Sequence, residues 1–351
     1  MSELHPNSTV LGIIFPNEPS PKVFILAQTF TVCTFLASHR SGEDVVRLEL
    51  GDESTLLRLC TIATLQRVAA LAIPHLNPET KRIGQGKMEG GQDVYFSVIA
   101  YVGHSTTLEE AWNDIDDAQL LKIMGELQNV MNLLHSLNLN QVSVKSLPLD
   151  EITIGSPSAG YFPDIASLLK HVARSLKLGT GMLTQSNIDG GITVKGNMRG
   201  KDSTVHLSSE ALGYLSKNCS LCHNDIEPRN CLAVCHNKDL SYSLAAIINW
   251  EMSGFYPWVY EIVTKRYFLG SSNLYLPWYT SIVSAVTDVT PHEKEFACAL
   301  DLMYCMREEK DVKSCAVGKV FRWRWIAREG LVRNEDPFLG WENVNSVTGA
   351  K

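Results

Sequence analysis

The sequence has no run of lysine and arginine. It carries 31 Lys and Arg against 38 Asp and Glu, and its formal net charge is −7. Binding to a nucleic acid or to an anionic membrane needs clustered positive charge that replaces counterions around phosphates. The short basic cluster Arg322–Arg328 is typical of a C-terminal helix with snorkelling arginines. We therefore predict neither a nucleic-acid partner nor a membrane partner.

Long apolar runs are absent as well. The first apolar run covers only Val10 to Phe15 and has no basic segment before it, which is too short for a signal peptide or a membrane span. The nine cysteines are odd in number and irregularly spaced, which indicates reduced core residues and not a disulfide framework. From these absences we predict a soluble, cytoplasmic protein.

One group of cysteines has a spacing that superficially resembles a zinc site. Its members are Cys219, Cys222, Cys231, Cys235 and His236. Two of them, Cys222 and Cys231, fall within apolar segments that are typical of strands. We expect these two side chains to pack inward and not to converge on a metal ion.

The apolar content is sufficient for a large core. The chain has 351 residues, of which 45% are hydrophobic and 20% charged, so it can form one large or two moderate units. Apolar and β-branched runs predict strands near residues 23–27, 30–36, 44–50 and 93–103, and helical periodicity predicts helices near 53–71, 116–139, 164–178, 260–276, 279–286 and 293–307. Residues 179–204 are rich in Gly, Ser, Thr and Asn, which favours a mobile loop, and the tail from residue 334 is polar.

The most informative stretch is residues 222–261. It holds two polar clusters, one from His223 to Asn230 and one that begins at Asn249, and apolar segments precede or follow each. This pattern predicts buried strands that deliver polar groups to one point. A carboxylate from Asp225 with the amides of Asn230 and Asn249 suits a phosphate-bound Mg²⁺, while the carboxylate orients a hydroxyl.

These residues resemble a known superfamily. HNDIEPRN (223–230) is similar to the HGDLHPRN-type catalytic loop of the aminoglycoside phosphotransferase and choline kinase-like superfamily. IINWEMSGFYPWVYE (247–261) is similar to the IIDWEMAGFYPEYWE-type segment of its fungal-type branch. The resemblance implies an α+β, protein kinase-like two-lobe fold with a small β-rich N-lobe (1–103) and a larger, mainly helical C-lobe (104–351). An acceptor-side insertion would lie at about 140–210.

The resemblance also implies roles for individual residues. Asp225 matches the catalytic aspartate, which accepts or orients the proton of the acceptor hydroxyl, and Asn230 matches an amide ligand of Mg²⁺. Asn249 stands where the superfamily has the aspartate that bridges Mg²⁺ to the phosphates, so metal affinity should fall. The remaining matches imply supporting roles in the loop: His223, Arg229, Trp250 and Glu251.

The nucleotide side departs from the superfamily pattern too. No glycine-rich turn lies between the first predicted strands, and Arg47 stands where a phosphate-contacting lysine is expected. The glutamate that should orient this lysine aligns with Thr61, or with Glu53 if the register is shifted. The predicted strand that ends at Tyr101 and Gly103 resembles the hinge segment whose backbone binds adenine.

Two hypotheses follow. The first is a phosphotransferase that uses ATP and Mg²⁺, with a modified metal site, to phosphorylate the hydroxyl of a small-molecule acceptor. The second is a pseudokinase, a kinase-fold protein that binds a small molecule or partner without phosphoryl transfer. The intact loop with Asp225 and Asn230 favours the first, and Asn249, Thr61 and the missing glycine-rich turn favour the second. The acceptor is not specified by the sequence.

Overall fold

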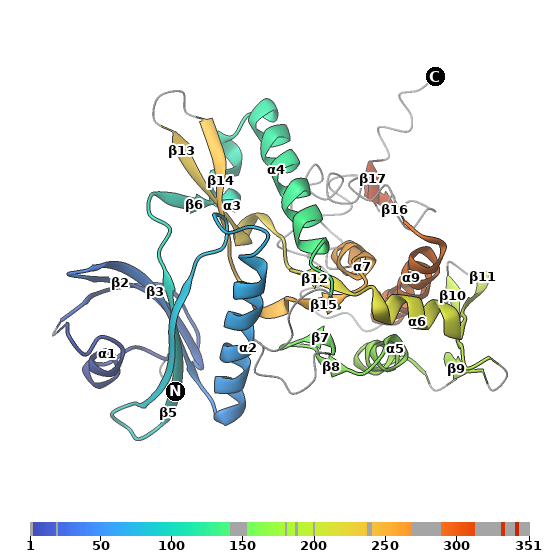
Figure 1. Cartoon of the computed structure of the whole chain (residues 1–351), viewed down its shortest axis with the longest axis horizontal. Coiled ribbons are helices and arrows are strands. Elements are labelled where there is room, and N and C mark those ends of the chain that lie inside the picture. Colours follow the sequence, from blue (N-terminus) through green and yellow to red (C-terminus); the bar gives the residue numbers. More distant parts are fainter. Residues whose placement is uncertain are drawn as a thin grey trace.

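The structure is a computed structural model of the chain. It describes residues 3–18, 20–140, 153–179, 181–186, 189–198, 201–236, 241–267, 289–312, 331–333 and 341–343. Figure 1 shows a β-rich part at one end and a larger, mostly helical part at the other, with helix α2 (Glu53–Ala69) between them. This arrangement is the predicted α+β, two-lobe fold.

The N-lobe is an antiparallel five-stranded sheet with the order β1-β2-β3-β5-β4. Its strands are β1 (Lys22–Gln28), β2 (Val32–His39), β3 (Gly42–Leu50), β4 (Thr80–Lys87) and β5 (Asp93–Ala100). One face buries a separate core that includes Phe35, Leu48 and Phe96, against which helix α1 (Ser8–Ile14) packs. Alternating apolar residues on β2 and β3 form this core because successive side chains point to opposite faces.

Helices dominate the C-lobe and enclose a second core. They are α3 (Leu108–Ala111), α4 (Asp117–His135), α5 (Ile165–Ser175), α6 (Ser209–Lys217), α7 (Val259–Tyr267) and α9 (Pro291–Val312), with 3₁₀ turns η1 (Trp112–Asp114), η3 (Pro228–Asn230) and η4 (Trp250–Met252). Helix α4 is the helix predicted at 116–139: Asp116 caps it by accepting a hydrogen bond from the Gln119 N–H. Its stripe of Met124, Leu127 and Leu134 is buried.

Small sheets complete the C-lobe. The strands are β6 (Ser105–Thr107), β7 (Ile154–Ser156), β8 (Gly160–Phe162), β9 (Leu183–Gln185), β10 (Ile192–Met198), β11 (Lys201–Leu207), β12 (Ser220–Cys222), β13 (Cys231–His236), β14 (Ser241–Ile247), β15 (Gly254–Tyr256), β16 (Leu331–Arg333) and β17 (Trp341–Asn343). They form sheets with the orders β11-β10-β9, β12-β15-β7-β8, β14-β13-β6 and β16-β17.

The mobile loop expected at 179–204 was a wrong prediction for much of its length. Residues 183–185, 192–198 and 201–207 form an antiparallel sheet instead, and helix α9 packs against its strands β10 and β11. Ile192, Val194 and Leu207 are buried. These three residues alternate with polar ones, and this period of two was obscured by the surrounding glycines and small polar residues.

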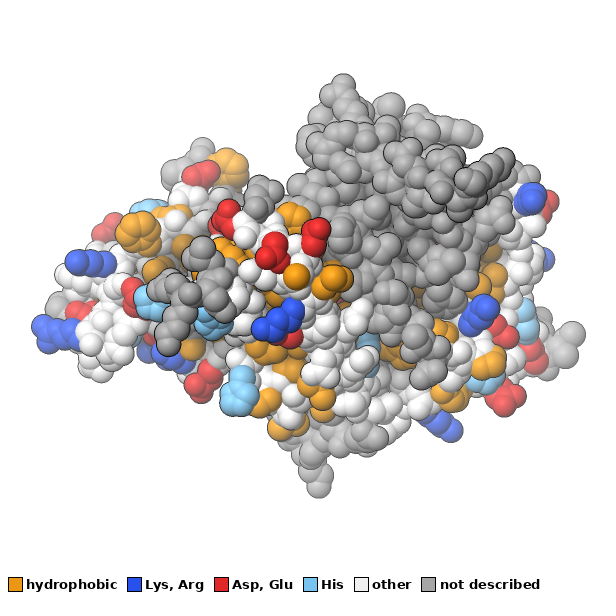
Figure 2. Space-filling view, turned by 90° about the horizontal axis from the view of Figure 1, so that it is seen from above, with side chains coloured by type: hydrophobic (Ala, Val, Ile, Leu, Met, Phe, Trp, Pro, Cys, Tyr) orange, Lys and Arg blue, Asp and Glu red, His pale blue; other side chains and the backbone are white. Residues whose placement is uncertain are grey.

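The other predictions from the sequence concern segments of which only some belong to the described residues. The helix expected at 260–276 is described only as α7, whereas the helix expected at 279–286 and most of the polar tail lie outside the described residues. The described cysteines are free thiols. Among the described residues, no helix combines the length and apolarity needed to cross a bilayer. On the face in Figure 2, the basic side chains of the described residues are scattered among acidic ones.

Candidate active site

A β-hairpin brings the two predicted amides together. Strands β13 and β14 pair antiparallel with Cys231 opposite Ile247, so the residue before β13 and the residues after β14 lie at the same end. The backbone N–H of Ile248 donates to the carbonyl oxygen of Asn230 at 2.9 Å. Asn230 and Asn249, 19 positions apart in the chain, are therefore neighbours at the mouth of this hairpin.

A second strand pair delivers the HND residues to the same place. Cys222 at the end of β12 lies opposite Gly254 at the start of β15. Asn224 follows in a left-handed backbone conformation with φ 61°, which asparagine tolerates better than most residues, and its side-chain Nδ2 donates to the Met252 carbonyl at 3.0 Å. Gly254 has no room for a side chain, because a Cβ there would overlap the carbonyl oxygen of Gly155.

His223 fixes the geometry of the loop at residues 223–230. Its Nε2 lies 3.1 Å from the carbonyl oxygen of Ile248, and its Nδ1 lies 3.2 Å from the backbone N of Asp225. A carbonyl only accepts and a backbone N–H only donates, so these partners select the neutral tautomer with the proton on Nε2. The ring also packs edge-on against Trp250, with centroids 4.6 Å apart. His223 thereby ties the two polar segments to each other.

The Asp225 carboxylate lies at the centre of the site. Its Oδ2 accepts a hydrogen bond from Asn230 Nδ2 at 2.7 Å, and Nη2 of Arg229 lies 3.3 Å from both carboxylate oxygens. Asn230 Nδ2 also donates to the Asp225 backbone carbonyl at 2.7 Å. These contacts hold the carboxylate in one orientation, and the ion pair with Arg229 lies on the exposed side, where solvent weakens it.

The amide of Asn249 lies between two oxygens that face the predicted metal position. Its Nδ2 is 3.4 Å from Asp225 Oδ2 and 3.3 Å from Asn230 Oδ1. Because both neighbours are acceptors, the NH₂ group and not the carbonyl oxygen must point toward them. Asn249 is itself left-handed, with φ 66°.

This donor set fits a divalent cation poorly. Mg²⁺ favours carboxylate oxygens, and Asn249 presents neutral N–H groups to the oxygens that would otherwise bind the ion. Asn230 offers one amide oxygen, and that oxygen already accepts from Asn249. The residues present therefore do not support a chemical step that depends on a tightly bound metal ion.

The nucleotide side contains an ion-pair network that the sequence did not predict. Arg47 Nε donates to Glu49 Oε1 at 2.6 Å, and Arg47 Nη2 donates to Glu251 Oε1 at 2.5 Å. Glu49 Oε2 accepts from Nη2 of Arg58, which lies on α2. We call Arg47, Glu49, Arg58 and Glu251 the arginine–glutamate network. It links β3 to α2 and, through Glu251, to the 3₁₀ turn directly after Asn249.

Neither of the two positions aligned with the superfamily glutamate, Thr61 or Glu53, pairs with Arg47. Thr61 is buried in α2 and donates its hydroxyl hydrogen to the Leu57 carbonyl at 2.9 Å, one turn earlier in the same helix. Glu53 is exposed in the first turn of α2. The partner of β3 on this helix is the cation Arg58, so the expected lysine–glutamate pair is present with its charges exchanged.

The two expected hinge residues lie in the connection from β5 to β6. Strand β5 ends at Ala100, and Tyr101 and Gly103 follow it. Their contact with a nucleotide base remains a prediction.

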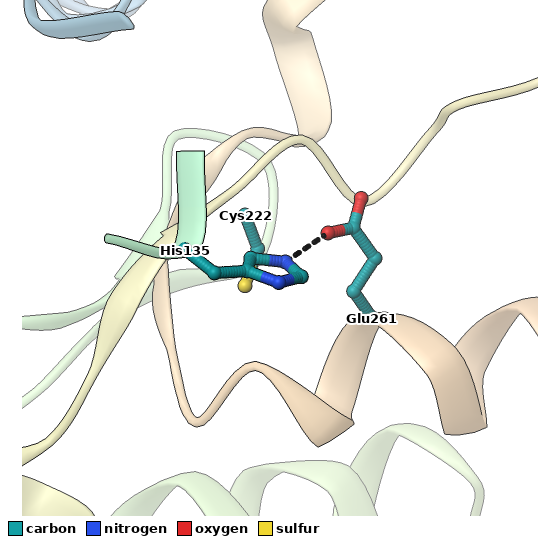
Figure 3. Close-up of side chains that lie close together, drawn as sticks. All are labelled: His135, Cys222 and Glu261. Carbon is teal, nitrogen blue, oxygen red and sulfur yellow. Dashed lines mark hydrogen bonds and ion pairs between the residues drawn. The ribbon is translucent and has the colours of Figure 1, made fainter. Parts of the chain in front are cut away.

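A buried group supports the loop from the opposite side (Figure 3). It consists of His135 at the end of α4, Cys222 at the end of β12 and Glu261 on α7. Glu261 Oε1 accepts the backbone N–H of Asn224 at 2.7 Å, and Oε2 lies 3.0 Å from Nε2 of His135. Burial raises the pKa of the Glu261 carboxyl, but the hydrogen bond and charge from His135, together with His223 and the Asn224 N–H, outweigh this effect and lower it below its ordinary value.

This group is better explained by hydrogen bonding than by a metal ion. Metal binding would require the Cys222 thiolate, whereas burial raises the pKa of this thiol well above its ordinary value, and the nearby Glu261 adds to that effect. The Cys222 Sγ lies 3.6 Å from the Ser220 carbonyl and 3.9 Å from the Tyr256 carbonyl, as expected for a weak S–H donor. Cys222 and Cys231, two members of the zinc-like group considered from the sequence, are both buried. The group in the structure is a different one, because His135 and Glu261 are not members of the group from the sequence.

Comparison with solved structures places this geometry in a known fold. A thermostable variant of aminoglycoside phosphotransferase APH(4)-Ia, in a ternary complex with AMP-PNP and hygromycin B, aligns with a TM-score of 0.54 at 13% identity. The alignment covers 91% of this chain and 97% of that one. The APH(4)-Ia crystal structure itself aligns with a TM-score of 0.52 at 12% identity over the same shares.

The chain has the fold of the aminoglycoside phosphotransferase and choline kinase-like superfamily. No family model matches the sequence, and no curated protein matches it. At such low identity the alignments establish the fold alone, so the fungal-type branch stays a prediction. The predicted superfamily fold is confirmed over most of the chain.

Four side chains of this site had no role assigned from the sequence: Glu49, Arg58, His135 and Glu261. Glu49 follows Arg47 by two positions on a strand, so both side chains point to the same face, and this spacing was an available signal. Glu261 ends the recognised motif. Arg58 and His135 carried no such signal, because each meets its partner only through tertiary packing.

Proposed function

We propose that the protein transfers a phosphoryl group from ATP to a hydroxyl of a small molecule. The observation that carries this proposal is the position of the Asp225 carboxylate, which Asn230 holds at 2.7 Å where four strand ends converge. The fold supports it, because the aligned phosphotransferase was crystallised with AMP-PNP and hygromycin B.

Asp225 has two roles in this reaction. The Asp225 carboxylate orients the acceptor hydroxyl and takes the hydroxyl proton. The hydroxyl oxygen forms a bond to the γ-phosphorus as the bond from that phosphorus to the β,γ-bridging oxygen breaks, and ADP leaves. Asn230 and Arg229 keep the carboxylate aligned for this step, which depends mainly on positioning.

The metal site in this proposal is a modified one. A divalent ion would meet the neutral amides of Asn230 and Asn249 where the superfamily offers an anionic ligand. Loss of one full charge lowers the affinity of the site for a hard cation. We therefore expect weak Mg²⁺ binding and slow phosphoryl transfer compared with a site that carries two carboxylates.

A second function is favoured by the contacts of Asn249 and Arg47. The Asn249 NH₂ group is hydrogen-bonded to both oxygens at the metal position, and Arg47 is held between two carboxylates. This is the arrangement expected of a kinase-fold protein that binds a small molecule or partner without phosphoryl transfer. The first function predicts turnover of ATP, whereas the second predicts none.

The test measures phosphoryl transfer directly. Purified protein with ATP and Mg²⁺ is assayed for ADP release without acceptor and with a panel of amino sugars, polyols and hygromycin B, and products are identified by mass spectrometry. We expect Asp225→Asn to reduce turnover about 10²- to 10⁴-fold. Asp189→Asn is the matched control, since Asp189 pairs with His206 on the distant β9–β11 sheet. ATP binding without any transfer would establish the second function instead.

A further inference from the structure

The contact between β3 and α2 has its charges exchanged relative to the superfamily pattern. The strand contributes the anion Glu49, and the helix contributes the cation Arg58. Arg47 shares the same carboxylate through its Nε. One buried glutamate, whose side chain is 7% exposed, therefore holds two guanidinium groups together.

These two guanidinium groups lie on the side of the metal position. Arg47 reaches Glu251, two residues after Asn249, and α2 packs against the turn η4 that contains Glu251. The Arg47 and Arg58 side chains remain 28% and 27% exposed. A guanidinium has five N–H donors, and the network engages two from Arg47 and one from Arg58, so both retain donors for a ligand.

The charges of the site balance without a metal ion. Three cations, on Arg47, Arg58 and Arg229, face three carboxylates, on Glu49, Glu251 and Asp225. In the superfamily pattern, aspartate at position 249 and a glutamate on the helix would leave the same region negative until a divalent cation bound. Paired arginines are well suited to phosphate oxygens, because their planar fork donates two parallel hydrogen bonds.

We propose that Arg47 and Arg58, held together by Glu49, form a clamp for the phosphate groups of the nucleotide, and that this clamp binds the nucleotide without a divalent cation. The proposal rests on the proposed function, since it concerns the same nucleotide in the same site. It assigns Arg58 as a binding residue and Glu49 as the residue that positions both arginines.

The experiment is calorimetric titration of the full chain with ATP, in EDTA and in Mg²⁺. We expect the wild-type protein to bind ATP in EDTA. Arg58→Met should bind ATP about tenfold more weakly, because a charge-assisted hydrogen bond to phosphate is lost. Arg58→Lys, which keeps the charge but not the fork, should be intermediate. Arg67→Met is the matched control on the same helix, where the arginine donates a hydrogen bond to Thr64. Its affinity should stay within about twofold of wild type.

A further variant separates binding from structural support. Glu49→Gln keeps one oxygen that can accept from a guanidinium and removes the negative charge that competes with phosphate, so it should lower ATP affinity clearly less than Arg58→Met does. If the ion pair has only a structural role, both variants weaken ATP binding alike, and the clamp is refuted. Thermal unfolding of each variant shows that the comparison is made on folded protein.

The outcomes also separate this proposal from the proposed function. ATP binding that requires Mg²⁺, or no ATP binding in either buffer, overturns the clamp. Turnover with Mg²⁺ but no binding in EDTA would leave the proposed function standing and the clamp refuted. Binding in EDTA that Arg58→Met weakens, with no turnover under any condition, would support the clamp and refute the proposed function.

Discussion

Replacement of His135 by leucine should destabilise the protein strongly. Glu261 is almost fully buried, and the His135 side chain beside it is 13% exposed. With leucine at position 135, the carboxylate keeps the Asn224 N–H but loses the partner that offsets its burial. Removing one member of a buried ion pair typically costs about 3–5 kcal/mol. That cost would be a large part of the about 5–15 kcal/mol by which most domains are stable.

A double-mutant cycle measures this coupling. Glu261→Gln keeps an oxygen for the Asn224 N–H and removes the charge, so it should cost less, about 1–3 kcal/mol. Once the charge is gone, His135→Leu should add little. The double variant should therefore cost at least about 1 kcal/mol less than the sum of the single variants. Urea denaturation followed by circular dichroism gives the four free energies of unfolding.

Strict additivity, or a cost below about 1 kcal/mol for His135→Leu, would refute the reasoning. Either result would mean that Glu261 does not depend on His135 for charge compensation. The catalytic loop supplies a second readout, because Asn224 directly precedes Asp225. Nucleotide turnover by Glu261→Gln should fall even under conditions where the variant remains fully folded.

Three further predictions concern pH, the metal position and a tight backbone contact. The pKa of Glu261 is lowered in the folded protein, so its carboxylate contributes to stability above about pH 4.3, the pKa of glutamate in the unfolded chain. This contribution is lost as the pH falls through the pKa of the folded state. The difference in unfolding free energy between wild type and Glu261→Gln should therefore narrow in acid, and a constant difference would contradict this. Asn249→Asp should make ATP binding respond to Mg²⁺ in calorimetry, whereas equal Mg²⁺ dependence in both proteins would show that the amide does not weaken the site. Gly254→Ala should cost about 1–3 kcal/mol or more in urea denaturation because its Cβ meets the Gly155 carbonyl, while the control Gly213→Ala on helix α6, where the new Cβ meets nothing within 4 Å, should be neutral or stabilising.

The convergence of Asp225, Asn230 and Asn249 could be anticipated from the sequence for a physical reason. Each polar cluster borders an apolar segment, and buried strands that pair in an antiparallel hairpin place their adjoining residues at one end. The motif resemblance added which residues should meet. What the pattern could not supply was the orientation of the Asn249 amide, which depends on two acceptors that become neighbours only in the folded chain.

The exchanged ion pair on the nucleotide side was beyond sequence reasoning. Helical periodicity predicts which face of α2 is buried, but Arg58 lies on its half-exposed border, where arginine is common without any partner. The superfamily pattern predicts an anion on the helix, at the position of Thr61 or of Glu53. The helix instead contributes the cation of the pair, and the anion lies on the strand.

In the predicted alignment, two departures from the superfamily pattern each remove a negative charge: Thr61 stands in place of glutamate, and Asn249 stands in place of aspartate. Arg47 replaces lysine without changing charge, and the charges of Glu49 and Arg58 offset each other. Fixed guanidinium groups can bind phosphates in the reactant and in the transition state alike, and such uniform binding improves affinity without raising turnover. A site that has exchanged a metal ion for arginines should therefore retain nucleotide affinity far better than it retains the rate of phosphoryl transfer.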